Sequence, residues 1–372
     1  MHSKRYHFRV FVAGLIMSTS LGACAAQSSE PWPRASLAEA GFATDLGERI
    51  DAGLDEGRYE NLHSVLVVRG GKLLLERYYE GEDEMWGRPR GRVAFGPEEL
   101  HDLRSVTKSM VGLLYGIALA EGIVPPLDAP LLEQFPEYPD LAADPQRRRM
   151  TVAHALTMML GTEWDEDLPY TDPRNSEHAM ELAEDRYRFV LDRPMVTEPG
   201  SQWTYNGGAT AVVARLIVKG SGQSLRDYAA EKLFAPLGIT EFEWVRGHDG
   251  VYIAASGLRL RPPDLARIGQ MLLDGGRWKG QQVVPAAWLE QSFQSQASLG
   301  DTDYGYQWWL SPQGSDGPRW IAGFGNGGQR LFMLPDLDML IVITAGNYNN
   351  WEKSRRLRAI VSQIIMPSLI RE

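Results

Sequence analysis

The sequence predicts an α/β (α+β) fold in which one antiparallel sheet is built from both ends of the chain and a mainly helical domain is inserted between them. Two observations predict this arrangement. Strand patterns occur near the N-terminus and again after about residue 300, whereas apolar residues recur with a helical period over about 102–237. A sheet assembled around such an insert leaves a cleft at the junction, where binding sites are favoured.

A helix and a hairpin are predicted at the start of the folded region. Residues 36–57 carry apolar side chains at helical spacing. Residues 63–81 then contain two β-rich runs separated by Gly70 and Gly71. Glycine pairs of this kind permit the tight turn of a hairpin, so an antiparallel sheet is expected to begin here.

Helices are predicted through the middle of the chain and strands after it. One helical face holds Val106, Met110, Leu113, Leu114 and Ile117. Further helical patterns cover residues 152–159, 176–191, 209–219 and 225–234, with another after residue 264. The tail returns to strands in residues 304–312, 318–335 and 338–348 and closes with an amphipathic helix over 351–370.

Composition places the chain among ordinary globular proteins. It has 372 residues, of which 44% are hydrophobic and 23% charged, so it is long enough to bury a full core. The formal net charge is −10, and no block of Lys and Arg occurs. A nucleic-acid partner is therefore not expected.

Residues 1–24 have the layout of a secretory signal. Basic residues Lys4, Arg5 and Arg9 precede an apolar stretch that is too short for an ordinary spanning helix. Cys24 directly follows Leu-Gly-Ala, which resembles the lipobox of bacterial lipoproteins, where the cysteine is lipidated. This predicts an exported lipoprotein that is anchored to a membrane through Cys24 and faces the periplasm or the cell exterior. The alternative is a plain signal peptide with an incidental Cys24.

Residues 25–35 are polar and interrupted by proline, and they are interpreted as a tether before a folded domain over 36–366. Cys24 is the only cysteine, so no internal disulfide can form and stability must come from packing.

Three other candidate sites are set aside. Residues 323–328 (GFGNGG) match a dinucleotide fingerprint, but the following residues alternate like a strand where that motif needs a helix. The seven histidines show no metal-ligand spacing, so a dedicated metal site is not predicted. The acidic group Glu163, Asp165, Glu166 and Asp167 is interpreted as a solvated turn and not as a glycosidase pair.

Ser105 and Lys108 form a candidate catalytic pair. They lie one turn apart on the same face of an apolar helix, and Ser105 falls in its first turn, beside unpaired backbone N–H groups. A desolvated lysine holds its proton less tightly and could accept the serine hydroxyl proton, which predicts a lowered pKa for Lys108. The alternative is that Ser105 only caps the helix while Lys108 extends to solvent.

Tyr205 adds a second element, about a hundred residues further on. It lies in a Gly-rich turn directly before a predicted helix, and a tyrosine beside a lysine can relay protons.

These motifs together resemble the serine β-lactamase and penicillin-binding-protein superfamily. The chain is similar in particular to the class C-like serine hydrolases, which include family VIII esterases, D-aminopeptidases and 6-aminohexanoate-dimer hydrolases. The resemblance covers nearly all of residues 36–366, and its segments occur in the family's order: LRSVTKS (103–109), TVAHALTMMLGTEW (151–164), PGSQWTYNGG (199–208), LFAPLGI (233–239), SGLRLRPPDLARIG (256–269) and GFGNGGQRLFMLPDLDMLIVITAGNY (323–348).

The resemblance implies a β-lactamase-like fold and a role for each matched residue. Ser105 would be the nucleophile, Lys108 its base and Tyr205 a second acid/base. The backbone N–H groups of Ser105 and Gln329 would form the oxyanion hole. The reaction would pass through an acyl-enzyme and need no cofactor.

Substrate contacts are expected from Asn206, Asn326, Gly327 and Gly328. The last three stand where relatives commonly have Lys or His before Thr-Gly, a cation that helps to bind a substrate carboxylate. Its absence puts β-lactam and peptidoglycan specificity in doubt. Asn326 is interpreted either as a substrate-orienting group or as part of a turn.

The predicted function is a serine hydrolase that cleaves a small-molecule carboxylic ester or small amide. Alternatives are a D-amino-acid peptidase or weak β-lactamase, and a non-catalytic protein that keeps the cleft to bind a ligand.

Overall fold

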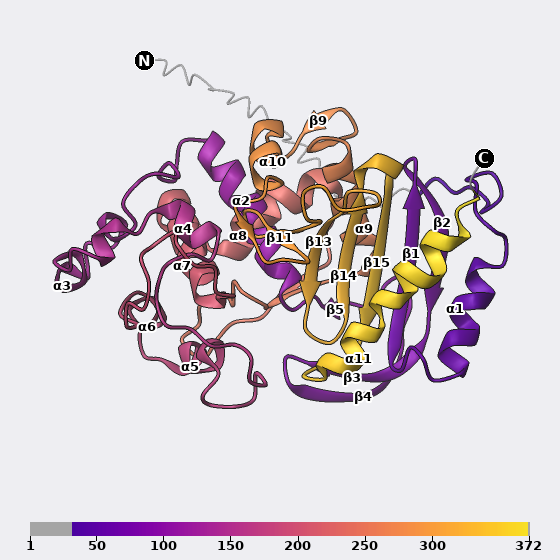
Figure 1. The fold of residues 1–372 in the computed structure, drawn as a ribbon, viewed down its shortest axis with the longest axis horizontal. Helices are drawn as coiled ribbons and strands as arrows, with labels where there is room; N and C mark the ends of the chain where they lie inside the picture. Colours follow the sequence, from indigo (N-terminus) through magenta and orange to yellow (C-terminus); the bar gives the residue numbers. More distant parts are fainter. Residues whose placement is uncertain (1–31, 371–372) are drawn as a thin grey trace, which may run out of the picture. The chain divides into compact units, whose positions relative to one another are not determined.

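Strands from both ends of the chain lie side by side in one antiparallel sheet. The computed structural model describes residues 32–370, and its main sheet has the order β10-β11-β12-β13-β14-β15-β1-β2 (Figure 1). The N-terminal strand β1 pairs with the C-terminal strand β15, with Val65 opposite Ile343. The predicted fold class is therefore confirmed. The strands are β1 (Leu62–Arg69), β2 (Lys72–Tyr78), β10 (Ala297–Ser298), β11 (Asp303–Tyr304), β12 (Trp309–Leu310), β13 (Ile321–Gly325), β14 (Gln329–Leu334) and β15 (Met339–Ala345).

The predicted hairpin is present between β1 and β2. Gly70 and Gly71 have φ values of 57° and 68°, which the two central positions of a tight hairpin turn require. The two faces of β1 enter different cores. Val65 and Val67 pack in one hydrophobic cluster, and Leu66 and Val68 pack in the other.

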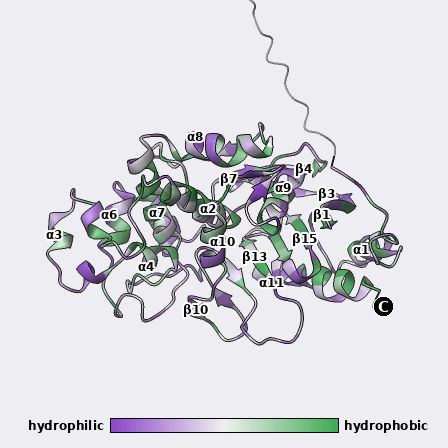
Figure 2. Ribbon diagram, turned by 90° about the horizontal axis from the view of Figure 1, so that it is seen from above, coloured by the Kyte–Doolittle hydropathy of each residue, from purple (hydrophilic) through white to green (hydrophobic). Residues whose placement is uncertain are grey.

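Helices cover both faces of this sheet. The helix α1 (Leu46–Asp55) and the C-terminal segment from α11 (Trp351–Arg356) to the π-helix Ile360–Ile365 share the cluster of Val65. The helices α2 (Val106–Ala120) and α9 (Pro262–Leu273) share the cluster of Leu66 on the other face. Figure 2 shows hydrophobic residues concentrated on the central α2 and on β15. The helix α2, which begins directly after Ser105, is thus inside the core.

The segment between the terminal strands is helical, as predicted. Its elements after α2 are α3 (Pro139–Ala142), α4 (Val152–Leu156), α5 (Ser176–Leu182), α6 (Arg186–Leu191), α7 (Gly207–Ser221) and α8 (Leu225–Ala229). The predicted helix over 176–191 is in fact two helices. Asp185 separates them because its side chain accepts hydrogen bonds from the backbone N–H groups of Tyr187 and Arg188 and so starts α6.

Three small sheets and one further helix complete the described chain. They are β3 (Glu80–Met85) with β4 (Arg88–Ala94), β5 (His101–Asp102) with β7 (Leu258–Leu260) and β6 (Glu243–Trp244), β8 (Arg277–Trp278) with β9 (Gln281–Gln282), and α10 (Ala286–Ser292). Single turns of 3-10 or π-helix occur at Leu132–Gln134, Arg147–Arg149, Ala230–Phe234, Ala235–Leu237, Pro335–Leu337 and Met366–Ser368. β5 ends three residues before Ser105, so it sets where α2 begins.

The folded region starts earlier than predicted. Trp32 donates its indole N–H to the carbonyl of Gly71, and Arg34 forms a β-bridge with Leu73. Residues 32–35 therefore belong to the fold and not to a tether, because they add backbone hydrogen bonds at the edge of β2. At the other end, Leu369 bridges to Phe42, so the fold also extends beyond residue 366.

The signal segment over 1–24, with the lipidation site Cys24, lies outside the described residues. Among residues 32–370, no helix has both the length and the apolar character needed to cross a membrane.

Candidate active site

Ser105 stands at the start of α2, where the backbone is held in an unusual conformation. The preceding residue, Arg104, has a φ of 49°, in the left-handed region that non-glycine residues seldom occupy. Its side chain is anchored by Glu84 and Asp102. Ser105 occupies the N-cap position, but its side chain makes no capping hydrogen bond. The alternative that Ser105 only caps the helix is therefore not supported, and its hydroxyl is available for chemistry.

Lys108 is buried beside Ser105. The Lys108 side chain is 2% exposed, which rules out the alternative that it extends to solvent. Its Nζ atom lies 3.2 Å from Ser105 Oγ, 3.2 Å from Glu177 Oε2 and 3.1 Å from the carbonyl oxygen of Ala255. Three acceptors around one nitrogen match the three N–H bonds of an ammonium group.

The charge of Lys108 differs from the expectation. Burial opposes its positive charge, but the negative charge of Glu177, with further contributions from Tyr205 and Glu166, outweighs burial and raises the pKa of Lys108 above its usual value. The expected lowering of that pKa is therefore wrong. Desolvation was predicted from the apolar helix, whereas the compensating carboxylate comes from a distant part of the chain.

Glu177 is a site residue that the sequence analysis missed. It lies in the first turn of α5, where Asn175 caps the helix by accepting hydrogen bonds from the N–H groups of Glu177 and His178. Its Oε1 atom accepts a hydrogen bond of 2.7 Å from Ser256 Oγ, and its Oε2 atom faces Lys108. A single glutamate in a helical pattern gives no linear signal for this role.

Glu166 corrects the interpretation of the acidic group as a solvated turn. Its side chain is buried and accepts hydrogen bonds from Trp164 Nε1 at 2.6 Å, from the backbone N–H of Gly207 at 2.5 Å and from Tyr170 Oη at 2.8 Å. Burial, reinforced by the charge of Glu177, raises the pKa of Glu166 to about 7. Alternating burial explains the error, because Trp164 and Glu166 point inward while Glu163, Asp165 and Asp167 are exposed.

Gly207 makes room for both carboxylates. A Cβ atom at this position would lie 2.2 Å from Glu177 Oε2 and 3.1 Å from Glu166 Oε1. The glycine at the start of α7 therefore lets two acidic side chains reach the neighbourhood of Lys108.

Tyr205 reaches the same pair from the turn before α7. The Lys108 Nζ atom lies 4.9 Å from the centre of the Tyr205 ring, which also stacks on Trp309 with ring centres 5.9 Å apart. Burial raises the pKa of Tyr205, while the charge of Lys108 and a hydrogen bond with the Ser105 side chain act in the opposite direction. The structure thus brings together the three predicted residues Ser105, Lys108 and Tyr205.

Of the predicted substrate-binding residues, Asn206 is buried in a helix cap and Asn326 lines the cleft. Asn206 is buried at the N-cap of α7, where its Oδ1 atom accepts a hydrogen bond from the N–H of Ala209. Asn326 lines the cleft, but its side-chain amide is already hydrogen-bonded to Asn349. Its Nδ2 atom donates to Asn349 Oδ1, and its Oδ1 atom accepts from the Asn349 backbone N–H. This geometry favours a structural role for Asn206 and the turn interpretation for Asn326.

Gly327, Gly328 and Gln329 follow Asn326 in the hairpin between β13 and β14. Gly327 and Gly328 have φ values of 93° and 110°, so they form a turn that other residues would strain. The Gln329 side chain is fully buried and bonds to the backbone of Ala345. Asn326, and not Gln329, is the hairpin residue that lines the cleft. The oxyanion role of the Gln329 N–H stays a prediction.

A cleft of about 380 Å³ opens over Ser105. Its walls come from β3, the start of α2, the loop before α5, α5 itself and the β13–β14 hairpin. The charged residues among its lining are Glu84, Arg104, Glu177 and Glu181. Burial raises the pKa of Glu181 to about 7, although Arg186 opposes this shift. The site therefore combines the buried Ser105 with several ionisable side chains along the cleft.

The fold and the buried Ser–Lys–Tyr group together define a serine hydrolase of β-lactamase-like architecture. The family model described as Beta-lactamase matches residues 50–364. The chain therefore belongs to the Beta-lactamase family.

Named relatives of this chain differ in what they act on. A 6-aminohexanoate-dimer hydrolase of Paenarthrobacter ureafaciens is 27% identical over 300 residues, which cover 74% of this chain and 70% of the relative. A lovastatin esterase of Penicillium rubens is 27% identical over 143 residues, 36% of this chain and 33% of the relative.

Solved structures share the fold at low identity. EstCE1, a hydrolase with promiscuous acyltransferase activity, superposes with a TM-score of 0.67 at 15% identity over 87% of this chain and 99% of its own. The octameric penicillin-binding protein homologue from Pyrococcus abyssi gives a TM-score of 0.62 at 18% identity over 87% of this chain and 77% of its own.

Proposed function

We propose that this protein hydrolyses a carboxylic ester or a small amide through an acyl intermediate on Ser105. The observation that carries the proposal is the distance of 3.2 Å between Ser105 Oγ and the Nζ atom of the buried Lys108, with the Tyr205 ring against the same nitrogen. A hydroxyl at a helix N-terminus beside a fixed positive charge is placed to attack a carbonyl carbon, because the developing oxyanion meets unpaired N–H groups.

Tyr205 is proposed as the group that accepts the Ser105 proton. The three N–H bonds of a charged Lys108 are directed at Ser105, Glu177 and Ala255, so this nitrogen has no lone pair for a further proton. The Ser105 hydroxyl proton can instead pass to the Tyr205 oxygen, with which Ser105 shares a hydrogen bond. The charge of Lys108 stabilises the phenolate form of Tyr205 that is required before this transfer. The transfer leaves Tyr205 as a neutral phenol and forms the new bond between Ser105 Oγ and the acyl carbon.

The same phenol then completes the cycle. Protonated Tyr205 gives its proton to the leaving alcohol or amine as the acyl bond breaks. Tyr205 next takes a proton from water, and the water oxygen attacks the acyl carbon. As the bond from Ser105 Oγ to the acyl carbon breaks, Tyr205 returns this proton to Ser105 Oγ, which releases the carboxylic acid and restores both Ser105 and the Tyr205 phenolate. Glu177 acts as a positioning residue, since its Oε2 atom holds Lys108.

The charge of the cleft supports a neutral acyl substrate. Arg104 is the only cation among the cleft-lining residues, and Glu84 and Asp102 already pair with it. The lining glutamates Glu84 and Glu177 are paired with Arg104 and Lys108, so a substrate carboxylate would find no cation in the lining that lacks a carboxylate partner. This arrangement favours esters or linear amides over β-lactams and peptidoglycan, which carry carboxylates.

A fluorophosphonate probe tests the nucleophile. Wild-type protein should be labelled covalently, and Ser105→Ala should lose the label. Ser201→Ala is the matched control, because Ser201 is exposed and its hydroxyl donates to the Glu198 carbonyl, so the label should persist in this variant. Folded wild-type protein that takes up no label would support the non-catalytic binding protein instead.

A substrate panel tests the reaction class. We expect turnover of p-nitrophenyl esters, of linear amides or of both, and little turnover of nitrocefin. Turnover of nitrocefin alone would overturn the ester or amide proposal in favour of a weak β-lactamase, and selective release of D-amino acids from peptides would favour the peptidase.

Export and lipid anchoring through Cys24 are part of the proposal. Their support is the basic start, the short apolar stretch and the Leu-Gly-Ala-Cys sequence of residues 21–24. The full chain should accumulate in the membrane fraction of a bacterial host and incorporate labelled fatty acid, and Cys24→Ser should lose both. A soluble, unlabelled wild-type chain would refute the anchor.

A further inference from the structure

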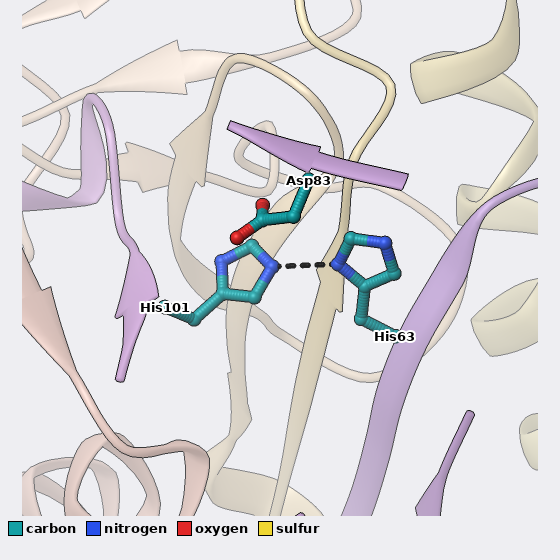
Figure 3. A group of neighbouring side chains, drawn as sticks. All are labelled: His63, Asp83 and His101. Carbon is teal, nitrogen blue, oxygen red and sulfur yellow. Dashed lines mark hydrogen bonds between the residues drawn. The ribbon is translucent and has the colours of Figure 1, made fainter. Parts of the chain in front are cut away.

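Two histidines and one aspartate meet in the interior, outside the cleft. His63 lies on β1, Asp83 on β3 and His101 on β5, so each comes from a different sheet (Figure 3). Both histidines are 0% exposed and Asp83 is 6% exposed. One ligand atom from each residue lies within 4.8 Å of the other two. The ligands are scattered over about forty residues, which explains why no metal motif is visible in the sequence.

The neighbouring Asn61 determines which nitrogen of His63 carries a proton. The Asn61 Nδ2 atom donates to the Glu82 carbonyl at 2.9 Å, and Asn61 Oδ1 accepts from the Glu82 N–H at 2.8 Å. These two bonds fix the amide orientation. Asn61 Oδ1, an acceptor, also lies 3.2 Å from His63 Nε2. His63 Nε2 must therefore be the protonated nitrogen, and His63 Nδ1 carries the lone pair.

His101 is fixed in the opposite tautomer by the backbone. Its Nδ1 atom lies 3.0 Å from the carbonyl oxygen of Asp102, which can only accept. His101 Nδ1 is therefore protonated, and the lone pair is on Nε2. That nitrogen lies 2.8 Å from His63 Nδ1. Two neutral imidazoles held in this way direct two lone pairs at each other, an arrangement that repels unless a positive species binds between them.

We propose that His63, Asp83 and His101 bind a divalent metal ion of the zinc class. Two imidazole nitrogens and one carboxylate oxygen are ligands that Zn²⁺ prefers, and the carboxylate supplies negative charge in a buried place. The hydrogen bonds of the second ring nitrogen of each histidine also match those of a metal site. Metal-bound histidines typically donate their second N–H to a carbonyl or carboxylate oxygen, as His63 does to Asn61 and His101 to Asp102.

A small local adjustment would admit the ion. Two nitrogens bound to tetrahedral zinc lie about 3.3 Å apart, roughly half an ångström more than the 2.8 Å seen here. A single proton shared between His63 Nδ1 and His101 Nε2 would compete with the metal ion for this position. The two facing nitrogens, 2.8 Å apart, would then hold one proton between them in place of the ion.

The ion would serve as a clamp and not as a catalyst. No member of the cluster lines the cleft over Ser105. Asp83 is held from outside by Arg90 at 2.9 Å and by the Tyr348 hydroxyl at 3.1 Å. The Tyr348 ring lies 4.6 Å from the guanidinium of Arg104, next to Ser105. Joining β1, β3 and β5 would thus stiffen the wall of the cleft.

Metal content and metal-dependent stability test the proposal on the full chain. Protein purified without chelator should hold about one zinc per chain. Removing it with a chelator should lower Tm by several degrees, and added Zn²⁺ should restore it. Co²⁺ should give visible absorption bands in place of zinc. Asp83→Asn and His101→Gln should lose the bound metal and the response of Tm, while His248→Gln, a variant of an exposed histidine outside the cluster, should keep both.

Two results would overturn the proposal. One is folded wild-type protein, shown by its thermal transition, that holds no metal and whose Tm does not respond to Zn²⁺ or Co²⁺. The other is equal metal uptake by wild type and Asp83→Asn. If the variants fail to fold, the chelator and cobalt experiments on wild-type protein still decide. An imidazole nitrogen NMR spectrum of metal-free protein with one doubly protonated histidine would identify the shared proton instead.

Discussion

The Oε2 atom of Glu177 lies 3.2 Å from the Nζ atom of Lys108, and both side chains are almost wholly buried. The two residues are 69 positions apart in the chain. This contact raises the pKa of Lys108 beside Ser105, and the proposed mechanism therefore uses Tyr205 and not Lys108 as the proton acceptor. The protonation state of the site therefore depends on a residue outside the serine and tyrosine motifs.

Replacing Glu177 with Gln should impair catalysis. The variant removes the charge that holds Lys108, so kcat/KM for a p-nitrophenyl ester should fall about 10-fold to 100-fold, as expected for the ~1.5–3 kcal/mol of a charged hydrogen bond. The pKa of Lys108 should also fall, because burial is then opposed only by weaker partners.

Glu163→Gln is the matched control, since Glu163 is exposed and pairs with Arg193 at the surface. It should keep wild-type activity. Unchanged kcat/KM in Glu177→Gln across pH 6–9 would contradict the positioning role.

Replacing Glu166 with Gln should change how stability depends on pH. The pKa of Glu166 is raised from 4.5 to about 7 on folding, so between these values the folded protein binds more protons than the unfolded chain. Stability must therefore fall as pH rises through this window, because a buried carboxylate becomes charged. Glu166→Gln removes this loss, and its Tm relative to wild type should rise between pH 4.5 and pH 7. Parallel Tm curves for the two proteins would show that Glu166 titrates normally.

Replacing Gly207 with Ala should displace the two buried carboxylates. Its Cβ atom would approach Glu177 Oε2 to 2.2 Å, too close for any real contact. We expect loss of esterase activity by at least tenfold and a lowered Tm. Gly96→Ala is the control, because nothing lies within 4 Å of its Cβ position. Activity retained in Gly207→Ala would mean that neither carboxylate needs its present position.

Replacing Asn206 with Ala should lower stability and leave substrate affinity unchanged. Its Oδ1 atom caps the 15-residue helix α7, and loss of such a cap costs about 1 kcal/mol. Asn206→Ser, which can still cap, should recover most of the lost stability. KM for the best ester should stay constant in both variants. A raised KM with unchanged Tm would restore the substrate-binding role predicted from the sequence.

Local features of the site were predictable because short-range geometry determines them. A spacing of three residues on one helix places Ser105 and Lys108 on the same face, within reach of each other. The Gly70–Gly71 turn and the strand after GFGNGG follow from backbone preferences in the same way.

The sequence by itself therefore determined the order of the motifs, the hairpin, the helical insert and the neighbouring positions of Ser105 and Lys108. Only the tertiary structure decided the charge of Lys108, the burial of Glu166 and the meeting of His63, Asp83 and His101. The physical reason is that the protonation of a group depends on its hydration and on the charges within a few ångströms, and contacts between distant segments set both.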